Sequence, residues 1–400
     1  MNRINEMIRL QEFKNVKRIK LIDCCSAIFS GGTPLTSKEQ YYDGNIPWIR
    51  SGEIDFNRIF RSERNISQEG LENSSAKLIR PKSVVMAMTG ATVAKVATIE
   101  AEMAANQSVC ALETNSQLDY RFLYFYLATK YLQLRNSAQG ALTSLNLERI
   151  KNIEIPLPPL NIQKEIVSIL DSFTSLIGKM KQEVEMRKKQ MDYYKEKLFS
   201  FGKEECEWRT LNELFTFKNG INKEKSDFGR GTPIINYVDV YRKRGLVKED
   251  IKGLVNSNTS EQSRYKCKRG DVFFTRTSET KEEVGFPSVL LEDIENCVFS
   301  GFVLKATPTT DLLDTHYCKY CFFTYQFRKE VIKSATYTTR ALTNGTSLSK
   351  ISIPVPSLEK QRQIVSILDT FETYISKLEK MIELRQKQYE YYREKLLTFE

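Results

Sequence analysis

The cysteines and the single histidine are the residues whose types and spacing come nearest to a metal site. Cys318 and Cys321 form a Cys-x-x-Cys pair with His316 just before them. A tetrahedral zinc site needs a second pair of ligands at suitable spacing. His316 is the only histidine, and the other six cysteines are scattered without a second pair. We therefore expect no metal site, and we interpret the pair as buried thiols on an aromatic helix.

Nucleotide and acid–base chemistry find no better support in the sequence. The segment Gly31–Lys38 (GGTPLTSK) has the glycines and lysine of a phosphate loop. It lacks the glycine that a phosphate loop carries directly before its lysine, so we expect a turn before a strand. The sequence also lacks G-x-G-x-x-G, H-E-x-x-H and the N/D-P-P-Y/F tetrapeptide of DNA amino-methylating sites. We expect no catalytic residues and no cofactor in this chain.

Polar loops with basic residues indicate a different kind of site, one that binds nucleic acid. The chain has a net charge of +10, which is compatible with a polyanionic partner. Arg, Lys, Ser, Thr, Asn and Tyr in loops can contact both phosphates and base edges. In the first half the candidates are Arg50, Ser51, Thr89, Thr92, Lys95, Ser144 and Asn146. In the second half they are Asn236, Tyr237, Arg242, Lys243, Arg244, Arg276, Thr277, Lys281, Thr338, Thr339 and Arg340.

The elements that position these loops are organised by an internal repeat. Residues 156–201 and 354–399 align without a gap, and half of the aligned positions are identical. Prolines stand at the start of each copy, just ahead of the expected helix, and past them the only helix-weakening residue is Gly178. Apolar residues recur at steps of four and three, which is the pattern of a coiled-coil helix. The sequence thus predicts two similar long helices, one at the end of each half.

The apolar seam of the first helix runs through Ile162, Ile166, Ile169, Phe173, Leu176 and Met180. A further four-residue step to Val184 reads as a stutter. We expect the two helices to pair antiparallel, although each could instead fold back on its own domain. The expected interface comprises Ile166, Ile169, Phe173, Met180, Tyr194 and Leu198 in the first copy and Ile364, Ile367, Phe371, Leu378, Tyr392 and Leu396 in the second.

The segments between the helices predict two related α+β domains. Each has a glycine turn, a short apolar strand, a basic turn, a Thr/Ser-rich loop with lysine and an aromatic helix. We expect domains at 1–155 and 203–353 and helices within 156–202 and 354–400, with internal pseudo-two-fold symmetry. The N-terminus is charged throughout, and no apolar run reaches the ~20 residues of a membrane span. With its reduced thiols, the protein is expected in the cytoplasm.

These motifs, taken together and in order, resemble the specificity subunits of type I restriction–modification systems, the HsdS family. The resemblance covers essentially all 400 residues. It is carried by Gly32-Thr33-Pro34 and Gly231-Thr232-Pro233, by the closing IPLPP and IPVPS segments, by the helix starts Gln163–Asp171 and Gln361–Asp369, and by the helix ends Tyr193–Leu198 and Tyr391–Leu396.

The resemblance implies a subunit of a bacterial or archaeal cell that reads double-stranded DNA without chemistry of its own. Each domain would read one half of a split, asymmetric site, and the helices would fix the spacer. Two methyltransferase subunits that use S-adenosylmethionine would dock on the helices, and restriction subunits that use ATP and magnesium would join them. Two other classes stay open from the residues: a coiled-coil interaction scaffold without a DNA role, and an enzyme with an unrecognised site.

Overall fold

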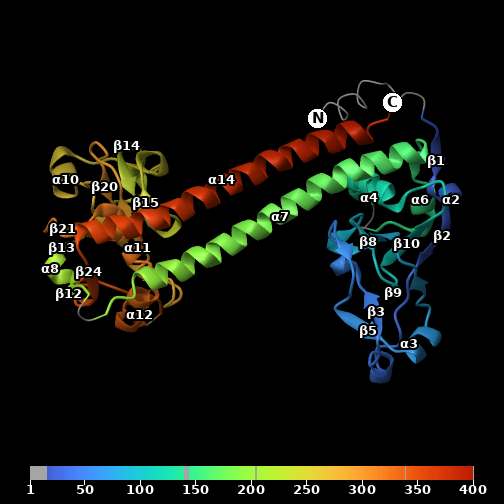
Figure 1. Cartoon of the computed structure of the whole chain (residues 1–400), viewed down its shortest axis with the longest axis horizontal. Helices are drawn as coiled ribbons and strands as arrows, with labels where there is room; N and C mark the ends of the chain where they lie inside the picture. The colour runs from blue at the N-terminus through green and yellow to red at the C-terminus, as the bar shows by residue number, and fades with distance from the viewer. Residues whose placement is uncertain (1–15, 139–143, 203–204, 338, 400) are drawn as a thin grey trace. The chain divides into compact units, whose positions relative to one another are not determined.

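The computed structural model describes residues 16–138, 144–202, 205–337 and 339–399. By packing, the chain divides into two units, Met1–Lys181 with Lys380–Glu400, and Gln182–Glu379. Each unit holds one of the two expected domains together with half of each long helix (Figure 1). The helices α7 (Leu160–Leu198) and α14 (Leu358–Leu397) begin soon after the prolines, as expected. No helix among the described residues offers an apolar stretch that could span a bilayer.

The first domain is built on a five-stranded sheet with strand order β2-β10-β7-β8-β4. A four-stranded sheet, β5-β3-β9-β6, and a two-stranded sheet, β1-β11, complete it. Its strands are β1 (Arg18–Lys20), β2 (Cys25–Ser30), β3 (Ile46–Ile49), β4 (Arg58–Ile59), β5 (Arg64–Ile66), β6 (Leu78–Ile79), β7 (Ser83–Ala87), β8 (Val96–Ile99), β9 (Met103–Ala105), β10 (Val109–Thr114) and β11 (Glu154–Pro156). Its helices are α2 (Leu21–Cys24), α3 (Gln68–Glu72), α4 (Tyr120–Thr129), α5 (Tyr131–Ser137) and α6 (Leu147–Lys151), with 3₁₀ turns η1 (Glu39–Tyr41), η2 (Ser51–Glu53) and η3 (Gly90–Thr92).

The second domain repeats this plan with strand order β13-β21-β17-β19-β15. Smaller sheets β16-β14-β20, β18-β23-β22 and β12-β24 accompany it. Its strands are β12 (Glu207–Thr210), β13 (Phe215–Asn219), β14 (Phe228–Ile235), β15 (Gly245–Leu246), β16 (Leu254–Val255), β17 (Val272–Thr275), β18 (Thr277–Ser278), β19 (Pro287–Leu290), β20 (Val298–Phe299), β21 (Val303–Pro308), β22 (Thr336–Tyr337), β23 (Ala341–Leu342) and β24 (Ser352–Val355). Its helices are α8 (Leu211–Leu214), α9 (Tyr237–Arg242), α10 (Thr259–Arg264), α11 (Thr315–Cys321), α12 (Tyr325–Ser334) and α13 (Gly345–Leu348), with η4 (Lys225–Asp227) and η5 (Lys248–Asp250).

Alternation along the central strand β7 explains why the five-stranded sheet of the first domain is covered on both faces. In β7, Val84 and Met86 join one apolar cluster, whereas Val85 and Ala87 join another. Successive side chains of a strand point to opposite faces, so the strand serves two cores. The first cluster also holds Phe122 of α4 and therefore lies between the sheet and that helix.

One buried ion pair distinguishes the two domain cores. Lys305 of β21 lies 3.1 Å from Asp271, and both side chains are almost fully buried. Lys305 pairs with Phe273 of the central strand β17, and Ala111 pairs with Val85 of the equivalent central strand β7. Lys305 and Ala111 therefore occupy equivalent positions in the two sheets. The first domain therefore has an alanine where the second has the lysine. The two domains thus share a backbone arrangement but differ in the side chains of their cores.

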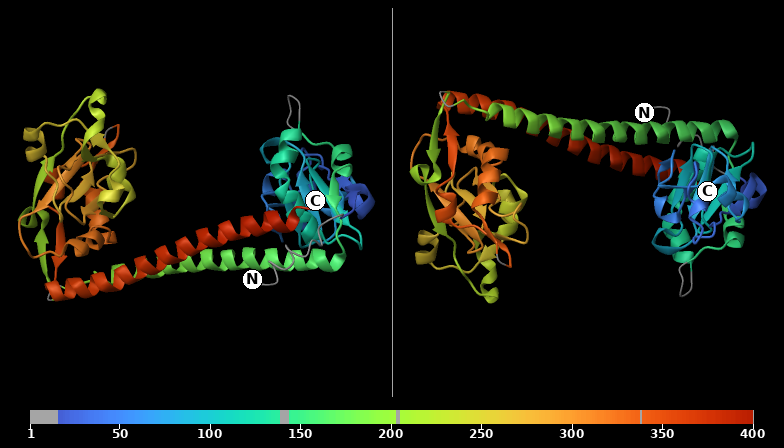
Figure 2. Two further views of the ribbon diagram at one scale, coloured as in Figure 1. Left: turned by 90° about the horizontal axis from the view of Figure 1, so that it is seen from above. Right: turned by 90° about the horizontal axis from the view of Figure 1, so that it is seen from below.

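The two long helices pack antiparallel, as predicted from their repeat. In the first unit the ring of Phe173 in α7 lies 5.7 Å from that of Tyr392 in α14. In the second unit Tyr194 stacks on Phe371, also at 5.7 Å between ring centroids. The start of each helix thus meets the end of the other, as Figure 2 lets the reader follow within each unit.

The helix ends also enter the domain cores, so the alternative of helices packing on domains is partly realised. Ile166 and Leu170 of α7 and Leu396 of α14 are fully buried in the same cluster as Phe122. Phe399, just after α14, lies edge-on to Phe122 at 6.1 Å. Each unit is therefore one packed body of domain and helix halves.

The observed seam keeps the predicted Ile166, Phe173 and Met180 but differs from the prediction at the positions between them. In α7 the buried apolar positions are Ile166, Leu170, Ile177, Met180, Val184 and Met191. Leu176 is 42% exposed, whereas its neighbour Ile177 is only 6% exposed. With the half-buried Phe173 and Arg187 counted, the seam advances by steps of four and three from Ile166 to Met191 without a stutter, which corrects that expectation. Where the apolar pattern has a gap, Arg187 stands in the seam and donates to Gln190 Oε1 at 2.7 Å.

The second helix shows the same seam at the equivalent positions. Ile364, Leu368, Ile375 and Leu378 are buried, and Arg385 donates to Gln388 at 2.7 Å in the place of Arg187. Ile367, expected at the interface, is 42% exposed. At these positions two apolar residues are adjacent, Leu176 with Ile177 and Ile367 with Leu368, so either residue of a pair fits the seam by sequence alone. The structure buries the second residue of each pair.

This phase makes a matched prediction about two neighbouring residues. Replacing Ile177 by Ala leaves a cavity in the helix pair and should cost about 2–4 kcal/mol of unfolding free energy. Replacing Leu176 by Ala should cost less than about 1 kcal/mol, because that side chain already faces solvent. Denaturant unfolding followed by helical circular dichroism measures both variants. Equal losses would contradict the observed phase.

Charged contacts fasten each domain to the start of its helix. In the first unit Arg121 of α4 pairs with Asp171 of α7 and lies over the Tyr124 ring at 4.8 Å. In the second unit Lys319 of α11 lies 3.0 Å from Asp369 and 2.7 Å from Glu372 of α14.

Asp369 makes the second joint sensitive to acid. Burial opposes its ionisation, but hydrogen bonds from Tyr320 and Lys319 outweigh burial, so the pKa of Asp369 lies below its ordinary value. The stabilisation is therefore present above the unfolded pKa of about 4 and is lost as the pH falls through the folded value. Between pH 5 and pH 3 the thermal midpoint of the wild type should fall more steeply than that of Asp369→Asn. The exposed Asp43→Asn is the control and should keep the wild-type slope.

Candidate nucleic-acid interface

In the first domain, most of the predicted contact residues lie together at one end of the five-stranded sheet. Arg50 and Ser51 follow β3 and open the turn η2. Thr92 belongs to η3 in the loop between β7 and β8, and its hydroxyl donates to Ser51 O at 3.0 Å. Thr89 of the same loop bridges to Ser144 through the backbone. Five residues from three separate segments therefore form one surface.

The basic side chains of this surface already have acidic partners. Arg50 Nη2 lies 2.8 Å from Glu63, and its backbone N–H donates to Glu53 Oε1 at 2.8 Å. Lys95 Nζ lies 2.6 Å from Asp55. Exposed pairs of this kind contribute only ~0–1 kcal/mol, so a phosphate or base edge can replace the carboxylate. The acids hold the cations in place without cancelling their capacity to bind.

Asn146 has a structural task at the edge of this surface. Its side chain accepts from Arg149 N at 2.9 Å and so caps the start of α6. An amide oxygen in this position satisfies a helix N–H that has no partner within the helix. Its contribution to a DNA contact would have to come from the remaining NH₂ group.

In the second domain the candidates come together in the small sheet β18-β23-β22. Thr277 of β18 pairs with Leu342 of β23, which pairs in turn with Thr336 of β22. Thr339 and Arg340 lie exposed in the connection between β22 and β23. Lys281 lies over the ring of Tyr337 at 5.8 Å. Thr338 is outside the described residues.

Arg276 anchors this small sheet to the rest of the domain. Its Nη1 donates to Gly301 O at 2.8 Å, and its carbonyl accepts from Thr343 N at 3.0 Å. Its Nε is buried without a hydrogen-bond partner among the described residues. A half-buried guanidinium held at one edge presents its remaining N–H groups in a fixed direction, which suits recognition of a planar acceptor.

Helix α9 joins the same surface through tyrosines. Asn236 stands directly before the helix, and its backbone N–H donates to Asp239 Oδ2 at 2.8 Å. Tyr237 and Tyr241 stack at 5.9 Å between ring centroids, and Tyr241 donates to Glu283 in the loop after β18 at 2.8 Å. Burial raises the pKa of Tyr237. The helix and the loop are thus held as one unit.

The expected basic cluster Arg242–Arg244 is split between different elements. Arg242 ends α9 and is exposed. Lys243 lies 2.8 Å from Asp250. Arg244 lies 3.8 Å from Glu372 of α14 and 5.0 Å from the ring centroid of Phe323, between α11 and α12. The three charges do not form one patch, because carboxylates from separate segments draw two of them away.

Three exposed apolar residues at this surface were not among the candidates predicted from the sequence. Phe302, whose carbonyl accepts from Arg276 N at 3.3 Å, is 67% exposed. Tyr337 and Leu342 are 53% and 38% exposed. Exposed apolar side chains beside basic ones can contact thymine methyl groups and sugars. Nothing in the local sequence marks these three as surface residues.

The two surfaces occupy equivalent places in the repeated fold. The loop after β7 carries Thr89, Thr92 and Lys95, and the loop after β17 carries Arg276, Thr277 and Lys281. β7 and β17 are both the central strand of their five-stranded sheets. The sequence comparison of these two loops predicts this equivalence correctly.

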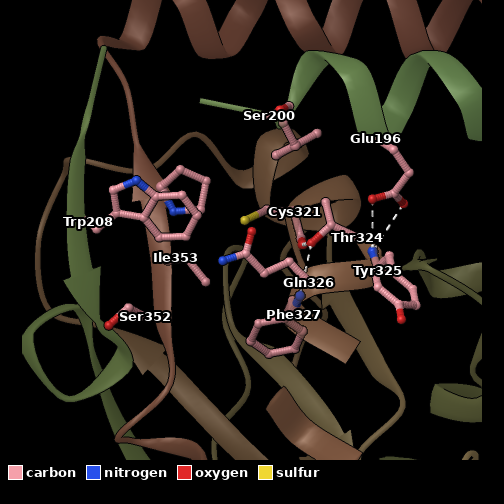
Figure 3. A pocket seen from close by; sticks show the side chains of 12 residues that line it. Glu196, Ser200, Trp208, Cys321, Thr324, Tyr325, Gln326, Phe327, Ser352 and Ile353 are labelled. Atoms are coloured by element: carbon pink, nitrogen blue, oxygen red, sulfur yellow. Dashed lines mark hydrogen bonds between the residues drawn. The ribbon is translucent and has the colours of Figure 1, made fainter. Parts of the chain in front are cut away.

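A pocket of about 200 Å³ in the second unit is a structural joint between α7 and the domain. Its wall includes Glu196, Trp208, Cys321 and Tyr325 (Figure 3). Both carboxylate oxygens of Glu196 accept from Tyr325 N at 3.0 Å, at the start of α12. Burial raises the pKa of the Cys321 thiol, which disfavours the thiolate that acts as a nucleophile. The lining residues thus serve packing and helix capping.

The Cys-x-x-Cys pair is buried in α11, as the sequence predicted. Burial raises the pKa of Cys318 to about 12. Across the described ranges, no group of three or more His, Cys, Asp or Glu side chains could hold a metal ion. The eight cysteines, all within these ranges, are free thiols.

Comparison with known proteins decides which family this duplicated architecture represents. The family model for the type I restriction modification DNA specificity domain matches twice, at residues 14–186 and 203–386. The chain belongs to the type I DNA specificity family. The scaffold without a DNA role, weighed from the sequence, finds no support in these matches.

Individual members of the family align over most of the chain. It is 28% identical over 319 residues to the EcoR124I/EcoR124II specificity subunit of Escherichia coli, covering 75% of this chain and 76% of that protein. It is 30% identical over 316 residues to the putative specificity subunit S.HindORF215P of Haemophilus influenzae, covering 74% and 76%. The crystal structure of the S subunit from M. genitalium has the same fold, with a TM-score of 0.57, 15% identity and coverage of 96% and 97%.

Proposed function

We propose that this specificity-family protein reads a bipartite, asymmetric site in double-stranded DNA, one half with each domain. The observation that supports this most strongly is the repeat of one sheet order in both domains with different side chains at the equivalent loops. The first surface carries Arg50 and Lys95 in ion pairs. The second carries Arg276, Lys281 and exposed aromatic residues. Unlike surfaces on a like frame would read unlike half-sites.

The antiparallel helix pair would set the spacer between the half-sites. Its stacked pairs Phe173–Tyr392 and Tyr194–Phe371 fix the register of α7 on α14. A stiff connection raises the effective concentration of the second domain at its half-site once the first is bound. Specificity would therefore come from both base contacts and the length of the helices.

The helices would also dock two methyltransferase subunits, because the repeat gives each helix the same exposed apolar residues. Met186 of α7 and Leu384 of α14 are 59% and 54% exposed. Tyr193 and Tyr391 are 62% and 55% exposed. Equivalent apolar positions on both helices suit two copies of one partner. The partners would supply the chemistry: S-adenosylmethionine for adenine methylation, and ATP with magnesium in the restriction subunits.

Mapping methylated adenines tests this function. The full chain is co-expressed with its methyltransferase subunit, and genomic DNA is sequenced with modified bases resolved. We expect one bipartite motif to be methylated only when this gene is present. Binding of the purified complex to a duplex with that motif should weaken steeply with salt. Methylation that is the same with and without this chain would contradict the proposal.

A further inference from the structure

Two buried glutamines occupy the same place at the start of the two long helices. Gln163 of α7 and Gln361 of α14 are both fully buried. Gln163 Nε2 donates to Pro158 O at 2.8 Å and to Gln117 O at 2.9 Å. Its Oε1 accepts from Asp119 N at 2.8 Å. One side chain therefore joins the helix, the strand exit before it and the loop that leads into α4.

Gln361 makes the same three bonds in the second unit. Its Nε2 donates to Pro356 O and to Leu312 O, each at 2.8 Å, and its Oε1 accepts from Asp314 N at 2.8 Å. All partners are backbone groups, so the arrangement does not depend on which side chains surround it. This explains how two domains with different cores keep one joint.

The glutamine joint is reinforced further along the same helix. Asp119 caps α4, and Asp314 caps α11. Those two helices then reach Asp171 and Asp369 through Arg121 and Lys319. The glutamine and the aspartate lie two turns of helix apart, about 12 Å. Two attachment points along the helix fix the orientation of the domain on it, whereas a single attachment point would let the domain rotate about that point.

We propose that Gln163 and Gln361 are positioning residues that set the angle of each domain on its helix and thereby control the spacing between half-sites that the complex accepts. This inference rests on the proposed function. Replacement by Met keeps the length of the side chain but removes all three hydrogen bonds. The stranded backbone groups of the first unit, Asp119 N–H, Pro158 O and Gln117 O, then require water or new partners. The loop before α4 must move to supply them, and the range of domain angles widens.

The test uses the full chain assembled with its methyltransferase subunit. Adenine methylation rates are measured on duplexes with the mapped half-sites at native spacing and at spacings changed by one and two base pairs. For Gln163→Met and for Gln361→Met we expect the preference for native spacing to fall about tenfold, with both half-site sequences unchanged. The double variant should lose more, because both joints act on the same duplex.

A control separates positioning from loss of stability. Val85 lies in the apolar cluster on the sheet face opposite α4, so Val85→Ala should lower the thermal midpoint and keep the wild-type spacing preference. Asp171→Asn weakens the second attachment point, the ion pair with Arg121, at a partly exposed side chain. It should lower the preference for native spacing, as Gln163→Met does. This variant therefore still tests the inference if a glutamine variant does not fold. Folded variants that methylate the site with the wild-type spacing preference would overturn the inference. A wild-type complex without methylation at any bipartite site would instead overturn the proposed function.

Discussion

Exchange of residues 1–155 for the corresponding domain of another family member should change one half of the methylated DNA site and leave the other half as it was. The physical reason is that each domain has its own cores and its own loop surface. The donor should carry an aspartate that caps the helix equivalent to α4 and a basic residue two positions later. The aspartate holds the start of α4 so that its own backbone N–H meets Gln163 Oε1, and the basic residue meets Asp171. Gln163 and Asp171 both stay with the recipient.

Mapping of methylated adenines measures this exchange. The reciprocal exchange of residues 203–353 is the matched control and should alter the opposite half-site. A change in both halves after a single exchange would show that the two domains do not read independently. Loss of all methylation with a folded chimera would point to a damaged joint, and restoring the capping aspartate should then recover activity.

Lengthening both long helices by one heptad should abolish methylation at the native spacing while the half-site sequences persist in a longer site. Seven residues add about 10.5 Å, comparable to three base pairs of duplex rise. Insertions after Lys181 and before Lys380 would keep the seam in phase, because steps of four and three sum to the inserted length.

The control for this experiment is the same insertion in one helix alone. The stacking of Tyr194 on Phe371 and of Phe173 on Tyr392 could then not both be kept. The single insertion should therefore lower the thermal midpoint strongly. Retention of the native spacing by the doubly lengthened protein would refute the role of the helices as a spacer.

The helix pair could be predicted from sequence because its pattern is periodic, but its phase could not. Leu176 and Ile177 are adjacent and equally apolar, so either fits a coiled-coil seam. The structure buries Ile177 and leaves Leu176 42% exposed. Sequence periodicity locates the apolar face of a helix to within one residue. Which of two adjacent apolar residues is buried depends on the surface that packs against the helix.

The positions of the candidate surface residues could be predicted where a local sequence pattern marked the loop that holds them. The segments with Thr89 and Thr277 share Thr and Lys after an apolar strand, and they occupy equivalent places. Arg244 failed to join a basic patch because its partner, Glu372, comes from a helix far along the chain. Gln163 opens a repeated motif, but its hydrogen bonds could not be predicted, because its partners are backbone groups that any sequence supplies.

The buried pair of Lys305 and Asp271 restricts how the second domain can change its target. Loss of either partner alone strands a charge in the interior, at a cost of about 3–5 kcal/mol. Single substitutions of Lys305 or Asp271 are therefore strongly destabilising. Simultaneous replacement of both by neutral residues is tolerated better, and the first domain has the neutral Ala111 at the position of Lys305. A library that randomises the second domain for new targets should hold this pair constant or replace both members together.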